Sequence, residues 1–411
     1  MISVTATRLQ FLQRGTVVAL GFSIPVSTAL DNVLLTVVAV ACLLAGLLPA
    51  VARQLRENKS LLLPVALFAL LAMGTLYGNS PLPSAWGHLW KYADLLFIPV
   101  FAVAFCLPKT RKHALHVFAG IIGVILILSY LLYFSLVPKM PFMAYDGLSP
   151  TVFKLKITHN LLMSFGAFLF VWLARTFAAM WLRIVCYVLA ALAAINVLFM
   201  VQGATGYVIL AMLTILWVCE RIGQRTTAIT ILLLLSISIT LMTVPNTLQR
   251  RVIQVQQEFQ LWRSGNPVAQ ATSSGQRLEY YSNTLAIIKE HPLIGVGTGG
   301  FPKAYAQQVK ATGKHVTQNP HNEFLNITAQ IGIGGLVLLI VMFWTQWRSA
   351  GRLATPMEQS LMRALVLTMV SGCLFNSLLL DHAEGLFYAW MSGLLYGGLK
   401  YAPSDKPPAT L

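Results

Sequence analysis

Long apolar runs recur along almost the whole chain, and they constrain its fold more than any other feature. We count twelve, at residues 15–28, 32–51, 61–77, 92–106, 114–137, 160–174, 184–201, 206–219, 227–244, 325–344, 361–380 and 386–399. A helix that crosses a bilayer needs about 20 apolar residues, so the shorter runs should extend into polar flanks. Strands of a membrane barrel would alternate with period two, and these runs do not. The sequence predicts an all-α integral membrane protein with about 12 transmembrane helices.

The charge content agrees with this class. Only 10% of the residues are charged, against about 25% in soluble domains, which excludes an ordinary soluble protein. The excess of 29 basic over 13 acidic side chains would suggest nucleic acid as a partner of a soluble chain. In a membrane protein it is more typical of inner loops and of sites for anionic ligands. We therefore expect membrane lipids as partners and no nucleic acid.

The distribution of basic residues predicts the orientation. With the N-terminus inside, the inner segments carry sixteen basic residues, and the short outer loops carry only Lys91, Lys139, Lys154 and Lys156. Short loops rich in Lys and Arg stay in the cytoplasm. Both termini are therefore expected to be cytoplasmic, and the first apolar run is interpreted as an uncleaved span.

One connection is too long and too polar to fit the pattern of short loops. Residues 245–323 contain no segment that could cross a bilayer, so we expect spans 1–9 in residues 1–244, an outer loop domain at 245–323, spans 10–12 in 324–401 and a tail at 402–411. Apolar residues spaced three and four apart predict a helix at 247–262. A second helix is expected at 276–290, with Ser273 and Gln276 as a capping box and Pro292 beyond its end.

The outer domain ends in Asn319-Pro320-His321-Asn322. Asn is a good N-cap and Pro a good first helical residue, which places His321 in the first turn of span ten. The helix dipole there disfavours imidazolium, so a neutral His321 could accept a proton. The alternative is a histidine that only caps or packs at a helix start.

Two other features of this domain suggest phosphate binding. Arg277, on the second helix, offers a planar fork that fits phosphate oxygens, although it could equally be a solvated surface residue. The glycine-rich run at 295–300 resembles a phosphate loop, but it lacks a preceding strand and a Lys-Ser/Thr ending. For this run we favour a flexible turn.

Further polar residues stand at the outer ends of predicted spans, where polar groups are usually functional, although each could be a helix cap. The candidate substrate-binding residues are Lys154, Lys156, His159, Asn160, Gln202, Asn322 and Asp381, with Thr205, His382 and Glu384 nearby. His88, Lys91 and Asp94 suggest an interfacial segment. No pair of His or Asp has metal-ligand spacing, so we expect neither a metal nor another cofactor.

Three segments together carry a resemblance to a known family: Gln276-Arg277-Leu278-Glu279-Tyr280-Tyr281, then the stretch from His291 to Phe301, then Pro320-His321-Asn322-Glu323-Phe324-Leu325 followed by Gly332 and Gly335. This pattern, and the large loop before span ten, resemble the O-antigen ligase and polymerase family. Within the family, the ligase that joins O-antigen to lipid A–core is the most similar.

The resemblance implies a function. It implies a glycosyltransferase of the Gram-negative inner membrane, acting in lipopolysaccharide biosynthesis on the periplasmic side without a metal. The donor would be O-antigen on undecaprenyl diphosphate and the acceptor a sugar hydroxyl of lipid A–core. The essential histidine and loop arginine of the family fall on His321 and Arg277. An acidic residue of many relatives is replaced near Gln330, and an arginine before span eight is replaced near Gln202.

Other functions remain open at this point. An O-antigen polymerase or a protein O-oligosaccharyltransferase shares the donor and differs only in the acceptor. A flippase for lipid-linked glycans is a different class, which would favour charges at mid-membrane and repeated halves. A multispan peptidoglycan glycosyltransferase would also share the lipid carrier.

Overall fold

The computed structural model describes residues 2–141, 143–144, 149–201, 203–221, 247–310 and 315–399. Over these ranges it contains helices and no strand, apart from one isolated bridge between Leu353 and Leu399. The all-α prediction is therefore confirmed. Among the described helices, six are long and apolar enough to cross a membrane, or seven if one bent pair forms a single span. The predicted span at 227–244 lies outside the described residues.

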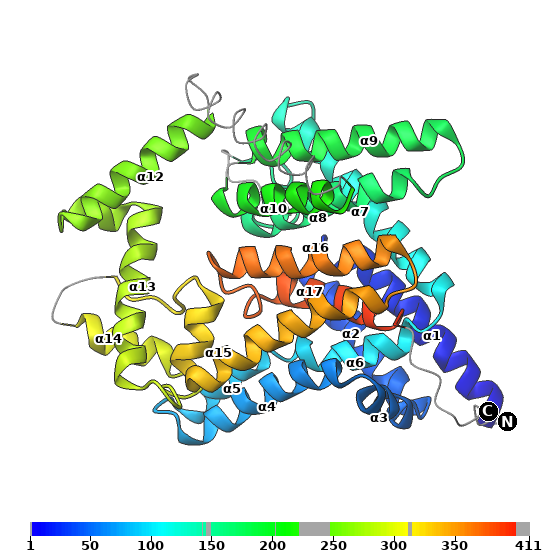
Figure 1. Cartoon of the computed structure of the whole chain (residues 1–411), viewed down its shortest axis with the longest axis horizontal. Coiled ribbons are helices and arrows are strands. Elements are labelled where there is room, and N and C mark those ends of the chain that lie inside the picture. Colours follow the sequence, from blue (N-terminus) through cyan, green and yellow to red (C-terminus); the bar gives the residue numbers. More distant parts are fainter. Residues whose placement is uncertain are drawn as a thin grey trace.

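The helices run nearly parallel in a bundle, with a helical loop at one end (Figure 1). The first part of the bundle contains α1 (Ile2–Ser23), α2 (Thr28–Leu44), α3 (Leu48–Glu57), α4 (Leu62–Tyr77), α5 (Leu82–Trp90), α6 (Asp94–Ala104), α7 (Pro108–Tyr133), α8 (Lys156–Ala174), α9 (Met180–Ile195) and α10 (Ala204–Arg221). The loop contains α12 (Thr247–Arg263), α13 (Ser273–Glu290) and α14 (Phe301–Val309). The chain then returns through α15 (Glu323–Ser349), α16 (Pro356–Cys373) and α17 (His382–Tyr396).

Several helices differ from the predicted spans. The run at 32–51 forms two helices, α2 and α3, bent by 96°, because Gly46 adopts a left-handed φ of 65° and Pro49 begins a new helix. The run at 92–106 yields a helix of only 11 residues with Pro99 inside it. In the loop, α12 and α13 match the two predicted helices closely. The N-cap of α13 is Thr272, whose hydroxyl accepts from the Gly275 amide, so the predicted capping box at Ser273 is wrong.

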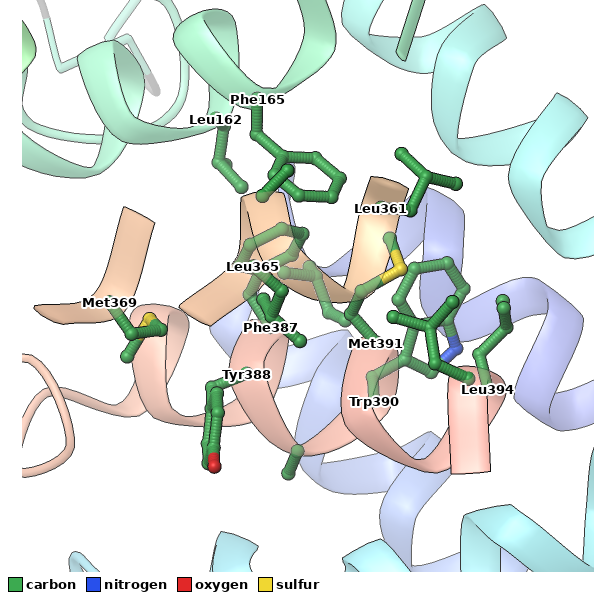
Figure 2. Close-up of a cluster of buried hydrophobic side chains, with 14 of the residues drawn as sticks. Leu162, Phe165, Leu361, Leu365, Met369, Phe387, Tyr388, Trp390, Met391 and Leu394 are labelled. Atoms are coloured by element: carbon green, nitrogen blue, oxygen red, sulfur yellow. The ribbon is translucent and has the colours of Figure 1, made fainter. Parts of the chain in front are cut away.

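The centre of the bundle is the packing of α17 against α16 and α8 (Figure 2). Nearly every residue of α17 is buried, as expected for a helix that is apolar all round. Phe387 meets Phe165 edge-on at 5.2 Å between ring centroids and stacks on Phe118 at 5.5 Å. The indole of Trp390 donates to the Val17 carbonyl at 2.7 Å. This core fixes the position of the start of α17.

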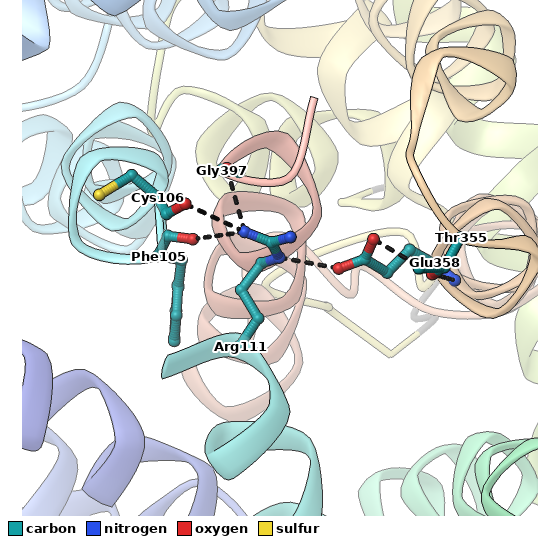
Figure 3. Close-up of polar contacts among 6 residues, drawn as sticks. All are labelled: Phe105, Cys106, Arg111, Thr355, Glu358 and Gly397. Atoms are coloured by element: carbon teal, nitrogen blue, oxygen red, sulfur yellow. Dashed lines mark hydrogen bonds and ion pairs between the residues drawn. The ribbon is translucent and has the colours of Figure 1, made fainter. Parts of the chain in front are cut away.

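A buried ion pair joins four helices at the end of the bundle away from the loop (Figure 3). Arg111, near the start of α7, pairs with Glu358 on α16, with Nε and Oε1 2.7 Å apart. Its Nη1 donates to the carbonyls of Phe105, Cys106 and Gly397. These carbonyls lie just after α6 and α17, where helical partners are lacking. Arg111 therefore satisfies two helix ends at once.

The loop is attached to a break in α15. Ile331 has φ −131° and Gly332 has φ 71°, so the helix is interrupted there. The amides of Val296 and Gly297 donate to the carbonyls of Ala329 and Gln330 at 2.8 and 2.9 Å. A membrane tolerates such a break only where protein satisfies the freed backbone groups. Here the glycine-rich run of the loop donates the hydrogen bonds that these carbonyls would otherwise lack.

Candidate active site

His321 lies where the loop domain meets the bundle, directly before α15. The helix begins at Glu323, and its N-cap is Asn322, whose Oδ1 accepts from the Leu325 amide at 3.0 Å. The Oδ1 of Asn319 accepts instead from the His321 amide at 2.9 Å, in a turn that gives His321 a left-handed φ of 53°. The prediction that His321 stands in the first helical turn is therefore wrong by two residues.

Two tyrosines of α13 hold this histidine. The ring of Tyr280 stacks on the imidazole, with centroids 5.8 Å apart and planes inclined by 28°. The hydroxyl of Tyr281 lies 3.2 Å from the His321 carbonyl and 3.0 Å from that of Leu374, just after α16. The side-chain Nδ2 of Asn322 also donates to the Leu374 carbonyl. The loop helix α13, the start of α15 and the end of α16 therefore converge on His321.

Arg277 belongs to the same site. It is half-buried and lies three residues before Tyr280, on the same face of α13. Burial lowers the pKa of His321, and the positive charge of Arg277 lowers it further. The imidazole is therefore expected to be neutral at pH 7. The predicted neutrality holds, with burial and Arg277 as the causes in place of the helix dipole.

A second polar cluster surrounds the start of α17. The hydroxyl of Thr158 donates to Glu384 Oε1 at 2.6 Å, and Lys154 Nζ lies 3.1 Å from Thr28 Oγ1. Burial lowers the pKa of the Lys154 ammonium, and the charges of Asp31 and Glu384 oppose that effect. Lys154 therefore lies close to the carboxylates of Asp31 and Glu384, just before the start of α8.

An acidic pair faces His382 in the same cluster. Its Nδ1 lies 3.3 Å from Asp94 Oδ2, and its Nε2 lies 4.0 Å from Asp31 Oδ2. Ser23 donates to the other oxygen of Asp31 at 2.5 Å. Asp31 is fully buried. The sequence analysis missed it, although Asp31 stands between the first two predicted spans, where polar groups are usually functional.

The two clusters are joined by Glu323, the first residue of α15. Tyr92 donates to its Oε1 at 2.8 Å, and the Leu379 amide donates to its Oε2 at 3.0 Å. Asp381, the N-cap of α17, interacts electrostatically with both Glu323 and Glu384. Polar groups therefore extend from His321 to Lys154 along one end of the bundle. Tyr92 and Glu323 were not predicted as site residues.

Other candidates lie elsewhere. His159 is buried in the bundle, with Nε2 3.0 Å from Asn196 Oδ1. Asn160 donates to the Val201 carbonyl at 3.0 Å, and Gly206 lies against its side chain. Both have structural partners inside the bundle. Lys156 is exposed at the start of α8, and Gln202 lies outside the described residues.

The glycine-rich run does not form a phosphate cradle. Besides the amides bonded to α15, Thr298 donates to the Gly74 carbonyl and Gly299 donates to Gln330 Oε1, both at 3.0 Å. Four successive amides are thus occupied by protein acceptors. The run does form turns, as expected, but hydrogen bonds fix it on α4 and α15. In the described ranges, no three His, Cys, Asp or Glu side chains are grouped so that they could hold a metal ion.

The fold and this site define a multi-pass α-helical membrane protein with a polar site between a helical loop and one end of the bundle. Residues 189–340 match the family model described as O-antigen ligase. The match extends from α9 into α15 and includes α13, the glycine-rich run and His321, so the resemblance of the motifs is confirmed. A search of curated proteins finds no match to this chain.

Proposed function

We propose that the protein transfers O-antigen polysaccharide from undecaprenyl diphosphate to a sugar hydroxyl of lipid A–core, at the periplasmic face of a Gram-negative inner membrane. The observation that carries the proposal is that His321 and Arg277 lie close enough to interact electrostatically in one half-buried site, where burial and the charge of Arg277 both lower the pKa of the imidazole. A base and a fixed cation are what glycosyl transfer from a lipid diphosphate requires.

The chemistry assigns one role to each residue. The acceptor oxygen attacks the anomeric carbon of the donor sugar, and the bond from that carbon to the diphosphate oxygen breaks. The hydroxyl proton passes to the imidazole of His321. Undecaprenyl diphosphate leaves with the bonding electrons, and Arg277 stabilises its developing charge through a bidentate contact. Direct displacement inverts the anomeric centre.

The remaining candidates surround this centre. Lys154 and Lys156 supply positive charge in place of the family arginine that is absent near Gln202. Asn322 and Asp381 border the acceptor side, next to Glu323. His159 and Asn160 are buried inside the bundle, so we propose that they act on substrate binding indirectly, by supporting the helices around the site.

The topology belongs to the same proposal. Twelve spans, with residues 245–323 as a periplasmic domain and both termini in the cytoplasm, place His321 on the side where lipid-linked glycans are used. The six or seven described helices that are long and apolar enough to cross a membrane support a multi-pass protein, and the excess of basic residues in the predicted inner loops supports the proposed orientation.

Transfer in vitro tests the function. Purified protein in liposomes receives lipid-linked O-antigen and lipid A–core, and the product is measured by its shift on a gel. We expect transfer without added divalent ions and equal transfer with EDTA. Polymerised donor without lipid A–core would identify a polymerase, and transfer to protein would identify an oligosaccharyltransferase. Loss of activity with EDTA that magnesium restores would contradict the metal-independent mechanism.

A further inference from the structure

The end of the bundle opposite His321 holds an arginine with two buried nitrogens that have no hydrogen-bond acceptor among the described residues. Arg221, the last residue of α10, stacks on Trp172 with its guanidinium carbon 4.2 Å from the ring centroid. Its Nε and Nη2 are buried, and neither has an acceptor among the described residues. The guanidinium carbon of Arg175 also lies over Trp172, 6.0 Å from the ring centroid. Two cations therefore share one indole.

The neighbouring acid is already paired. Glu220 accepts from Arg363 at 2.7 Å and from the hydroxyl of Ser360. Trp172 also donates its indole N–H to Ser360. Arg221 interacts electrostatically with Glu220 but forms no ion pair with an acid among the described residues. Buried donors without acceptors are costly, which points to a ligand that supplies oxygens.

An apolar groove of about 340 Å³ lies between α8, α9 and α10 and extends toward this cluster. Its walls include Ala167, Val171, Tyr187, Ala194, Leu213 and Trp217. Trp217 stands one helical turn before Arg221, and its buried indole N–H also has no acceptor among the described residues. Ser164, fully buried at the other end of the groove, has an unbonded hydroxyl over the same ranges.

We propose that this groove binds one acyl chain of an anionic phospholipid, whose phosphate is held by Arg221 with support from Arg175. The apolar walls of the groove and the hydrogen-bond donors at its mouth together indicate which molecule it binds. An alanine-lined groove at membrane depth accepts a hydrocarbon chain. Three donor atoms at its mouth, Nε and Nη2 of Arg221 and Nε1 of Trp217, match the acceptor oxygens of a phosphodiester and an ester. Positive charge at the membrane surface favours a lipid with net negative charge.

The location separates this site from the proposed chemistry. The end of α16 at Leu374 contacts Tyr281 and Asn322, whereas its opposite end, at Ser360 and Arg363, contacts the Arg221 cluster. The lipid would therefore belong to the leaflet opposite His321. It is a structural lipid of the bundle and does not depend on the proposed transferase function.

Native mass spectrometry of the full chain in a non-ionic detergent tests the site. Phosphatidylglycerol and phosphatidylethanolamine are added in turn at equal concentration. We expect one phosphatidylglycerol to be retained in preference to phosphatidylethanolamine. Arg221→Gln should weaken this binding about tenfold or more, as expected for loss of a charge-assisted contact. Ala194→Phe should weaken both lipids by filling the groove.

A matched control is available on α15. Arg348 also stands over a tryptophan, 5.8 Å from the Trp344 ring centroid, but it is exposed and lines no part of the groove. Arg348→Gln should leave lipid binding unchanged. Thermal melting confirms that each variant is folded. Equal retention of the two lipids by the parent protein, or unchanged binding in folded Arg221→Gln and Ala194→Phe variants, would overturn the proposal.

Discussion

His321 owes its character to its surroundings rather than to its place in a helix. Tyr280 covers one face of the ring, and Asn319 fixes the backbone in a left-handed turn. Asparagine tolerates this backbone better than most residues and cannot act as a base at pH 7. His321→Asn should therefore keep the fold and lower the transfer rate by about 10²–10⁴-fold. Rate per folded molecule is the measurement, and a variant within a few-fold of the parent would make His321 structural.

The charge of Arg277 should be visible in the pH dependence. It lowers the pKa of His321, and the base form of the imidazole is the neutral one. Transfer should therefore rise with pH through a pKa below 6.5 and stay level above it. Arg277→Gln removes the positive charge, so the acid limb should move to higher pH while the plateau falls. Arg277→Lys should recover part of the plateau and keep the limb at low pH.

Arg263→Gln provides the control for this experiment. Arg263 ends α12 and is exposed, so its loss changes the net charge of the domain without changing the site. Its pH profile should match that of the parent. An unchanged acid limb in Arg277→Gln would show that the limb belongs to another group.

Motif residues were predictable one by one, but their partners were not. His321, Arg277 and Asn322 all belong to the motif segments, and the structure brings these segments into one site. Glu323 meets Tyr92 across 231 positions, and His382 meets Asp31 and Asp94 from three different helices. Such contacts depend on how helices pack, which no local spacing encodes. The existence of the helices followed from the apolar runs, whereas the break in α15 at Ile331 depends on Val296 and Gly297, about 35 residues earlier in the chain.

At the scale of elements, the glycine-rich run acts as the attachment of the loop to the bundle. Gly297 has φ 84°, and a Cβ added there would lie 2.2 Å from the Gly78 Cα. Gly297→Ala should therefore destabilise the protein by at least about 1–2 kcal/mol, from backbone strain alone. Gly334 lies in α15 with nothing within 4 Å of an added Cβ, so Gly334→Ala should be neutral or slightly stabilising. Thermal melting in one detergent compares them, and equal midpoints would contradict the assigned attachment.

The ion pair of Arg111 and Glu358 is a second contact that holds several helices together. The sequence analysis counted Arg111 among the residues that orient the chain, yet only 6% of it is exposed. Arg111→Met leaves a buried carboxylate and three carbonyls without their donor, so we expect a loss on the order of 3–5 kcal/mol. Lys109→Met, two residues away and exposed, should have little effect.

A second substitution separates charge from packing at this site. Arg111→Met combined with Glu358→Leu removes both charges and should regain part of the lost stability. If the double variant is no more stable than Arg111→Met alone, the carbonyl contacts of Arg111 matter more than its ion pair.

At the scale of the whole molecule, the break in α15 couples the stability of the loop to that of the membrane helix. The amides of Val296 and Gly297 belong to a surface loop by sequence, but their acceptors are carbonyls of a membrane helix. We expect them to open together with that helix, because its broken turn depends on these bonds. In hydrogen–deuterium exchange they should therefore be protected to the same degree as the amides of α15, and far longer than those of α12. The loop is thus held to the helix bundle by backbone hydrogen bonds of the kind that stabilise a helix.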